Sequence, residues 1–454
     1  MTGATGYVAS WVVCACFQKG YRVRGTVRNI ANTQKIQHLI DLAEEYHAHL
    51  ELIETDLLAD DRWDAAVADC DFIFHLACPN PSQEPKNPQE EMIRPALEGT
   101  KRLLTALSRR QTPPRRMVMT SSVTAIAFGT NHVGKVYSDN DWTCLTSSKY
   151  PLSAYSMTKT LSERAAWDFV AALPAEKRFE LVAVNPTFAV GPMLSKGDCT
   201  SAALFRKILM AEIPGLVNMT LDLVSIVDVA RVHLLALTHP EAAGKRILVH
   251  SPTTPITMQE ISVILRKEFS HLGYSPSSFV LSDWIIRTAA LSGDADIKAV
   301  LPIIGIKRVL DAVNLREVLG YQTRTDVDSK ALVLEMVHAG FHAGVIPDKS
   351  PNKSLSTNYV RPKFNLICGE RDSDSGRLDR TEMDGDISRG IGGKEVEDEF
   401  RELRQRLSGL EGRLEKESAD RQTEGWYMKL VIVVQFLLFL TYLLSACFST
   451  RKAA

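Results

Sequence analysis

Short apolar segments alternate with amphipathic segments over the first half of the chain. Five segments are predicted as strands, because they are short and rich in β-branched and other apolar residues: 22–27, 50–54, 71–76, 116–121 and 180–185. Three segments between them carry apolar residues at helical intervals of three and four: 32–46, 87–107 and 153–173. Because this alternation is typical of βαβ units, it predicts an α/β fold, a doubly wound parallel sheet with helices on both faces.

A glycine-rich turn opens the chain, before an apolar segment that is predicted as a buried helix. Gly3, Gly6 and Ala9 have the spacing of the dinucleotide fingerprint. The first glycine permits a tight turn, the second lets the backbone approach a pyrophosphate, and the third small residue lets helix and strand pack closely. Tyr7 opens the helix, whose N-terminal N–H groups would meet the phosphates. The turn therefore predicts a Rossmann-type cofactor site.

The predicted second strand ends in a basic residue. In an enzyme that uses NAD, an acidic residue at this place binds the ribose 2′-hydroxyl group. Here Arg28 follows the strand, and Lys35 lies one or two turns into the next helix. A base where an acid is expected predicts a 2′-phosphate, and therefore NADP(H). The alternative is that Arg28 is an ordinary surface residue.

Two further strand ends are expected to line the cofactor. Asp56, with Leu57 beside it, follows the strand at 50–54 and could accept a hydrogen bond from adenine. The strand at 71–76 ends in a stretch whose backbone would lie along the cofactor, at Leu76 and Ala77. Both placements rest on the rule that ligands of open parallel sheets bind at the carboxyl ends of the strands.

Three side chains form a predicted catalytic set. Ser122 ends the strand at 116–121, and Tyr155 and Lys159 are spaced i, i+4 on one helix face. A free tyrosine has a pKa near ~10, and a lysine cation one turn away favours the phenolate. Tyr155 could then give a proton to a carbonyl oxygen that Ser122 holds by a hydrogen bond. The alternative is a solvent-exposed Tyr–Lys pair on the helix surface.

Composition and domain organisation limit the partners. The 53 basic and 54 acidic residues nearly balance, which gives no electrostatic basis for binding nucleic acid. The eight cysteines include no Cys-x-x-Cys pair, so no metal site is predicted. We expect an NADP-binding domain over residues 1–190 and a smaller substrate lobe with closing helices over residues 191–345.

The chain continues beyond these domains with a different composition. Residues 346–394 are polar and are predicted as a disordered linker. Residues 395–418 carry an a/d heptad pattern, which predicts a short coiled-coil helix: Val396, Phe400, Leu403, Leu407, Leu410 and Leu414. Self-association or contact with a partner helix is expected, and a solvated helix without a partner is the alternative.

The last apolar segment predicts membrane attachment. Residues 430–448 include no charged side chain and are long enough to cross a bilayer core of ~30 Å. With Lys429 before it, the predicted transmembrane anchor covers residues 429–448. We expect a tail anchor, with the catalytic domain in the cytosol and the helix in the endoplasmic reticulum or the mitochondrial outer membrane.

The motifs of residues 1 to about 345 together resemble a known family. GYRVRGTVRN, IRPALEGTKRLL, MTSSVTA, YSMTKTLSERAAW and VNPTFAVGP are similar to segments of extended short-chain dehydrogenases/reductases, in the branch of dihydroflavonol 4-reductase and NADPH-dependent aldehyde and ketone reductases. The resemblance implies Ser122, Tyr155 and Lys159 as the catalytic triad and places Pro186 and Thr187 near the nicotinamide. It does not extend to the C-terminal quarter of the chain.

The resemblance also raises a question about the first strand. The family has a buried strand before the glycine turn, at the centre of a sheet ordered 3-2-1-4-5-6. Only Met1 and Thr2 precede Gly3 here. We expect a destabilising gap in the sheet, explained by a start site placed too late, by a real truncation, or by a strand borrowed from elsewhere.

These observations lead to two hypotheses for function. The first is a membrane-tethered NADPH-dependent oxidoreductase that interconverts an aldehyde or ketone and the corresponding alcohol, with a sterol or steroid 3-dehydrogenase as a variant. The second is a tail-anchored adaptor whose Rossmann domain is a catalytically impaired scaffold. The complete catalytic set favours the first hypothesis, and the short start favours the second.

Overall fold

The computed structural model describes residues 1–59, 62–79, 85–130, 134–148, 150–195, 199–213, 215–292, 295–324 and 327–366. All of them belong to one compact unit, Met1–Ser375. The predicted coiled coil, the membrane segment and residues 367–394 of the predicted linker lie outside the described residues. Within the described part of the chain, no helix is long and apolar enough to span a membrane.

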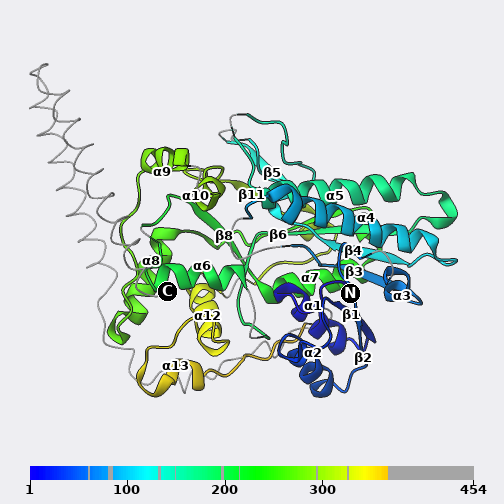
Figure 1. Cartoon of the computed structure of the whole chain (residues 1–454), viewed down its shortest axis with the longest axis horizontal. Coiled ribbons are helices and arrows are strands. Elements are labelled where there is room, and N and C mark those ends of the chain that lie inside the picture. Colours follow the sequence, from blue (N-terminus) through cyan, green and yellow to red (C-terminus); the bar gives the residue numbers. More distant parts are fainter. Residues whose placement is uncertain are drawn as a thin grey trace, which may run out of the picture. The chain divides into compact units, whose positions relative to one another are not determined.

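A parallel sheet organises the larger lobe (Figure 1). One part contains β3 (Phe72–His75), β4 (Arg116–Thr120), β6 (Glu180–Pro186) and β9 (Arg246–Val249), in that order. The other part is the parallel pair β1 (Val23–Val27) and β2 (Leu50–Glu54). All five strands predicted from the sequence are present, and all pairings are parallel.

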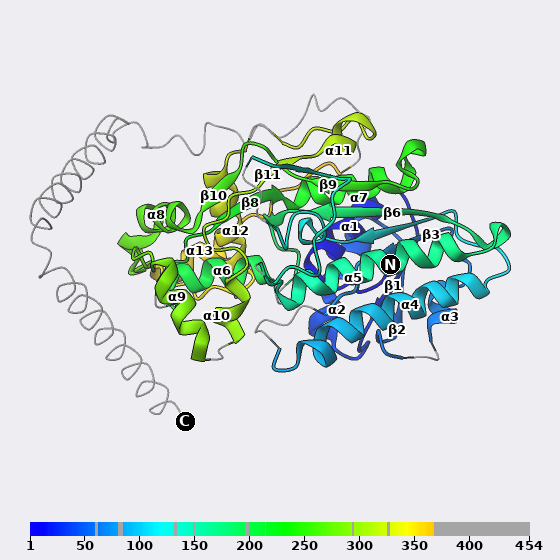
Figure 2. The same ribbon diagram turned by 90° about the horizontal axis from the view of Figure 1, so that it is seen from above.

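Helices cover both faces of this sheet, as Figure 2 shows. They are α1 (Tyr7–Gln18), α2 (Thr33–Glu45), α3 (Trp63–Val67), α4 (Arg94–Arg109, preceded by the π-turn Gln89–Ile93), α5 (Ala154–Ala172), α7 (Ile226–Thr238) and α11 (Val313–Glu317). Neighbouring strand residues enter different cores because strand side chains alternate. Met117 packs with α3, α4 and α5, whereas Val118 packs with α1 and α7. The doubly wound α/β fold is thus confirmed.

The smaller lobe has its own sheet and core. Strands β10 (Pro255–Thr257), β8 (Thr220–Ser225) and β7 (Phe188–Val190) are adjacent in that order. The helices of this lobe are α6 (Thr200–Leu209), α8 (Met258–Phe269), α9 (Asp283–Ala289), α10 (Ala295–Val300) and α12 (Ser329–His342). A two-stranded sheet pairs β5 (Val136–Ser138) with β11 (Val309–Asp311). Between β8 and β10 the chain returns to the larger sheet with α7 and β9, so residues 191–345 contribute to both lobes.

Two residues occupy the place of the expected first strand. Thr2 N donates to Phe74 O (2.9 Å), and Thr2 forms a parallel bridge with His75. On the other side, Thr26 N donates to Met1 O (2.9 Å). Met1 and Thr2 therefore give both neighbouring strands backbone partners, and the order is β2, β1, Met1–Thr2, β3, β4, β6, β9. No borrowed segment pairs with β1 on this side among the residues that the structure describes.

The predicted linker starts too early in the chain. Residues 346–366 are ordered parts of the compact unit and include α13 (Ser354–Thr357). Ile346 and Leu366 are almost fully buried, and Leu366 N donates to Gln18 Oε1 of α1 (2.7 Å). The prediction of disorder was wrong for these residues, because a mostly polar segment can be ordered when a few of its apolar side chains are buried against the folded domain.

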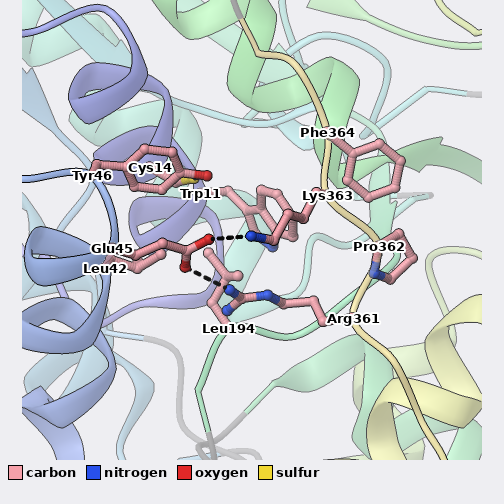
Figure 3. A pocket seen from close by; sticks show the side chains of 10 residues that line it. All are labelled: Trp11, Cys14, Leu42, Glu45, Tyr46, Leu194, Arg361, Pro362, Lys363 and Phe364. Atoms are coloured by element: carbon pink, nitrogen blue, oxygen red, sulfur yellow. Dashed lines mark hydrogen bonds and ion pairs between the residues drawn. The ribbon is translucent and has the colours of Figure 1, made fainter. Parts of the chain in front are cut away.

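The end of this segment packs across α1 and α2 (Figure 3). The Phe364 ring meets the Trp11 ring edge-on, with 5.9 Å between centroids. Glu45 of α2 forms ion pairs with Arg361 (3.0 Å) and Lys363 (3.2 Å). A C-terminal strap, residues 359–366, thus covers the helices that follow the glycine turn and β1.

Candidate active site

The glycine turn has the geometry that a dinucleotide needs. Gly3 has φ +64°, and a Cβ there would lie 2.9 Å from Ala77 Cα, so a side chain at Gly3 is excluded twice. Gly6 is different: its φ is −71°, and a Cβ would meet no protein atom closer than 3.4 Å. Gly6 is exposed at the N-cap of α1 and leaves the helix N-terminus open to a phosphate. The turn therefore fits the pyrophosphate of a dinucleotide.

The residues predicted to read the adenosine end lie at the carboxyl edge of β1 and β2. Arg28 directly follows β1 and is exposed, as is Lys35 in the first turn of α2. Asp56 is exposed after β2, and its carboxylate accepts Leu58 N (2.9 Å). Leu57 packs against Gly99 of α4, where an added Cβ would come within 2.5 Å of its side chain. These positions leave both basic side chains accessible to a phosphate.

The side chain of Tyr7 has a partner outside the glycine turn. Its hydroxyl donates to Gly191 O (3.1 Å), directly after β7 of the smaller lobe. Burial raises the pKa of the Tyr7 phenol well above its usual range, so the group stays protonated. The side chain thus connects the two lobes, and only the backbone of Tyr7 is left to face a phosphate.

The remaining predicted cofactor positions lie at neighbouring strand ends. Leu76 and Ala77 follow β3, and both backbone N–H groups donate to Thr2 Oγ1 (3.1 and 3.0 Å). Pro186 ends β6 and is buried, and Thr187 N donates to Val249 O of β9 (3.0 Å). Because all four residues follow parallel strands, they share one edge of the sheet, the edge at which open α/β sheets bind ligands.

The predicted catalytic residues come from β4 and α5. Ser122 is buried just after β4, where its Oγ accepts Thr124 N (3.2 Å). Lys159 Nζ donates to Thr120 O (3.0 Å), which joins the helix to the end of the same strand. The ammonium lies 5.9 Å from the centroid of the Tyr155 ring, and Tyr155 is half-buried. The structure thus places Lys159 beside Tyr155 and the end of β4, as the motif predicts.

The electrostatic surroundings keep the lysine charged. Burial lowers the Lys159 pKa, but the neighbouring Cys78, Tyr155 and Glu163 groups outweigh burial, and the net shift is upward. A charged ammonium therefore lies beside the Tyr155 ring. Two of the neighbours were missed from the sequence. Glu163 carried a signal, since it follows Lys159 by one helical turn, whereas Cys78 carried none.

A buried hydrogen-bond chain connects the turn to α4. Thr2 Oγ1 lies 2.8 Å from His75 Nδ1, and His75 Nε2 lies 3.0 Å from Thr100 Oγ1. Since Thr2 Oγ1 accepts two backbone N–H groups, its proton points to Nδ1, and the network assigns a neutral His75 with the proton on Nε2. Burial lowers the His75 pKa to about 3.

The sequence match defines the family. Residues 1–249, more than half of the chain, match the model of the NAD dependent epimerase/dehydratase family. The chain belongs to this family. Membership confirms the expected extended short-chain dehydrogenase/reductase type and the use of a nicotinamide dinucleotide.

Several proteins that are similar to this chain are named as reductases. A cinnamoyl-CoA reductase of Medicago truncatula is 34% identical over 255 residues, which cover 55% of this chain and 74% of that protein. A dihydroflavonol 4-reductase of Arabidopsis thaliana is 32% identical over 283 residues, which cover 62% of this chain and 71% of that protein. The chain is therefore an NAD(P)-dependent oxidoreductase of this family.

A solved structure supports the fold. The yeast methylglyoxal/isovaleraldehyde reductase complexed with NADPH superposes with a TM-score of 0.60 at 24% identity. The match covers 76% of this chain and 98% of that one. The shared fold thus covers about three quarters of the chain.

Proposed function

We propose that the protein is an NADPH-dependent reductase of an aldehyde or ketone, with oxidation of the alcohol as the reverse reaction. The observation that carries the proposal is the joint placement of Lys159, Tyr155 and the end of β4, beside a glycine turn open to a dinucleotide. The names of the relatives, and the NADPH bound to the yeast neighbour, support the same reading.

The residues divide the chemistry among them. When bound, the nicotinamide supplies the hydride. Ser122 Oγ donates a hydrogen bond to the substrate carbonyl oxygen, and Tyr155 gives that oxygen its proton. Lys159 places its positive charge beside the Tyr155 ring. Arg28 and Lys35 bind the 2′-phosphate and so select NADPH over NADH.

One titration and one turnover assay test the assignment. NADPH should bind at least tenfold more tightly than NADH, and Arg28→Ala should remove most of that preference, since a charge-assisted contact would be lost. Tyr155→Phe should lower kcat by about 10²–10⁴-fold and leave NADPH affinity within twofold. Unchanged turnover in Tyr155→Phe, or equal affinity for both dinucleotides, would contradict the proposal.

We further propose that residues 429–448 tether the enzyme to the endoplasmic reticulum or mitochondrial outer membrane, with the catalytic lobes in the cytosol. The uncharged 430–448 segment supports this, and the heptads of 395–418 support self-association. Alkaline extraction of the membrane fraction should leave the full chain in the pellet and release a variant that lacks 429–454. Release of both would contradict the tether.

A further inference from the structure

Glu163 is a buried carboxylate next to the proposed catalytic set. It lies on α5 one turn beyond Lys159, and its side chain is fully buried. A buried carboxylate is costly unless it is paired and hydrogen-bonded. Neither the glycine turn nor the proposed proton transfer requires a carboxylate here, so its partners indicate its role.

Four donors converge on this carboxylate from different elements. Ser121 Oγ, just after β4, donates to Oε2 (2.5 Å), and Asn185 Nδ2 of β6 donates to the same oxygen (2.9 Å). Arg246 Nε of β9 donates to Oε1 (2.6 Å), and Trp167 Nε1 of α5 donates to it more distantly (3.3 Å). Glu163 therefore connects α5 to three adjacent strands, β4, β6 and β9.

Two of these contacts lead directly to Ser122. Ser121 is its neighbour in the chain, and Asn185 Nδ2 also donates to Ser122 O (3.1 Å). The backbone on either side of the Ser122 Cα is therefore held by groups that the Glu163 carboxylate orients. Among the hydrogen bonds of the described residues, none joins Ser122 to that carboxylate, so Glu163 acts on Ser122 through Ser121 and Asn185.

The ion pair between Glu163 and Arg246 also holds the segment after Ser122 in place. Arg246 donates to the carbonyl oxygens of Ala125, Asp139 and Asp141. Its guanidinium also lies 3.8 Å from the centroid of the Trp142 ring. The chain that leaves the catalytic serine is thus fixed to the cation that neutralises Glu163.

We propose that Glu163 is a positioning residue that sets the place of the Ser122 hydroxyl through Ser121 and Asn185, an inference that rests on the proposed reductase function. A displacement of about 1 Å at a reacting group costs roughly 10²-fold in rate. We therefore expect Ser121→Ala and Glu163→Gln to lower kcat by about 10- to 100-fold, with the NADPH Kd within threefold of the unchanged protein.

A double-mutant cycle in the full-length protein separates positioning from general stability. Ser121→Ala removes the shortest contact to Glu163 and leaves the ion pair in place. Trp167→Phe is the matched control, because it removes a donor to the same carboxylate that has no connection to Ser122. Ser121→Ala should slow turnover in the parent protein and have no further effect in a Ser122→Ala background. An equal loss of rate in both backgrounds, or an equal loss in Trp167→Phe, would overturn the proposal.

A readout without turnover keeps the test independent of the proposed function. If the parent protein shows no NADPH-dependent turnover, the proposed reductase function is contradicted. Hydrogen exchange then still tests the role of Glu163. Hydrogen exchange of the amides in residues 116–127 should be faster in Ser121→Ala and in Glu163→Gln than in the parent, and unchanged in Trp167→Phe. Equal exchange in all variants would show that Glu163 does not hold this segment.

Discussion

The two parts of the larger sheet differ in how many strands hold them in place. Strands β3, β4, β6 and β9 form a continuous parallel ladder, and the proposed catalytic residues lie at its carboxyl edge. The β1–β2 pair carries the residues proposed to read the 2′-phosphate, Arg28 and Lys35. In the described residues, this pair connects to the ladder through Met1 and Thr2.

The proposed proton transfer and the proposed choice between NADPH and NADH therefore depend on different parts of the sheet. The groups proposed to transfer the proton lie at the edge of a four-stranded ladder that a buried ion pair supports. Arg28 and Lys35 lie at the edge of a strand pair that is joined to this ladder by two residues, Met1 and Thr2, which we call the joint. Disturbing the joint should weaken dinucleotide binding before it alters the arrangement of Ser122, Tyr155 and Lys159. Each prediction below compares a change in one part with a change in the other.

The largest effect is expected from the buried ion pair in the catalytic part. Arg246→Met leaves the Glu163 carboxylate buried without its cation, which should lower the free energy of unfolding by about 3–5 kcal/mol. Arg62→Met removes the exposed pair with Glu54 of β2 (3.6 Å) and should cost less than about 1 kcal/mol. Urea unfolding of both variants measures the contrast. Similar losses would mean that the two parts of the sheet are equally dependent on their charges.

An intermediate effect is expected at the joint. Thr2→Val removes the acceptor of Leu76 N and Ala77 N and should cost about 2–3 kcal/mol, since unmet buried N–H groups are expensive. Thr2→Ser keeps the hydroxyl and serves as the control. Thr2→Val should also speed hydrogen exchange in Val23–Val27 more than in Arg116–Thr120. Uniform acceleration in both strands would show that the sheet opens as one unit.

Taken over one pH unit, the smallest effect is a change in pH dependence. The folded-state pKa of His75 is about 3 against 6.5 in the unfolded chain, so below pH 6.5 the unfolded chain binds a proton at this ring that the folded protein does not. The free energy of unfolding therefore falls as the pH falls from 6.5, by about 1.4 kcal/mol per pH unit for this group. In His75→Gln the slope between pH 6 and pH 4 should be shallower by that amount. An unchanged slope would mean that His75 is not held neutral by the fold.

The sequence was most informative where the signal is local. The strand segments and the i, i+4 pair Tyr155 and Lys159 follow from periodicity and helix geometry, and the structure places them as expected. The Glu163–Arg246 pair joins residues 83 positions apart, and the Thr2–His75 contact spans 73. No local pattern encodes such partners, because only the assembled sheet brings them together.

The strap was missed for a related reason. Its polar composition predicted disorder, yet Phe364 and Leu366 find partners on α1, more than 340 positions away. Tyr7 illustrates the same limit, since the motif concerned the backbone N–H groups at the start of the helix, and the side-chain bond to Gly191 was not predicted. A motif defines the backbone of such a turn, whereas side-chain partners depend on the lobe packed beside it.

The position of Met1 also matters for anyone who handles the protein. Its nitrogen donates to Arg24 O (2.7 Å) between two strands, and burial lowers the pKa of this amine. Residues joined before Met1, as in a purification tag, would continue between β1 and β3, and they would either pair with both strands or force the strands apart.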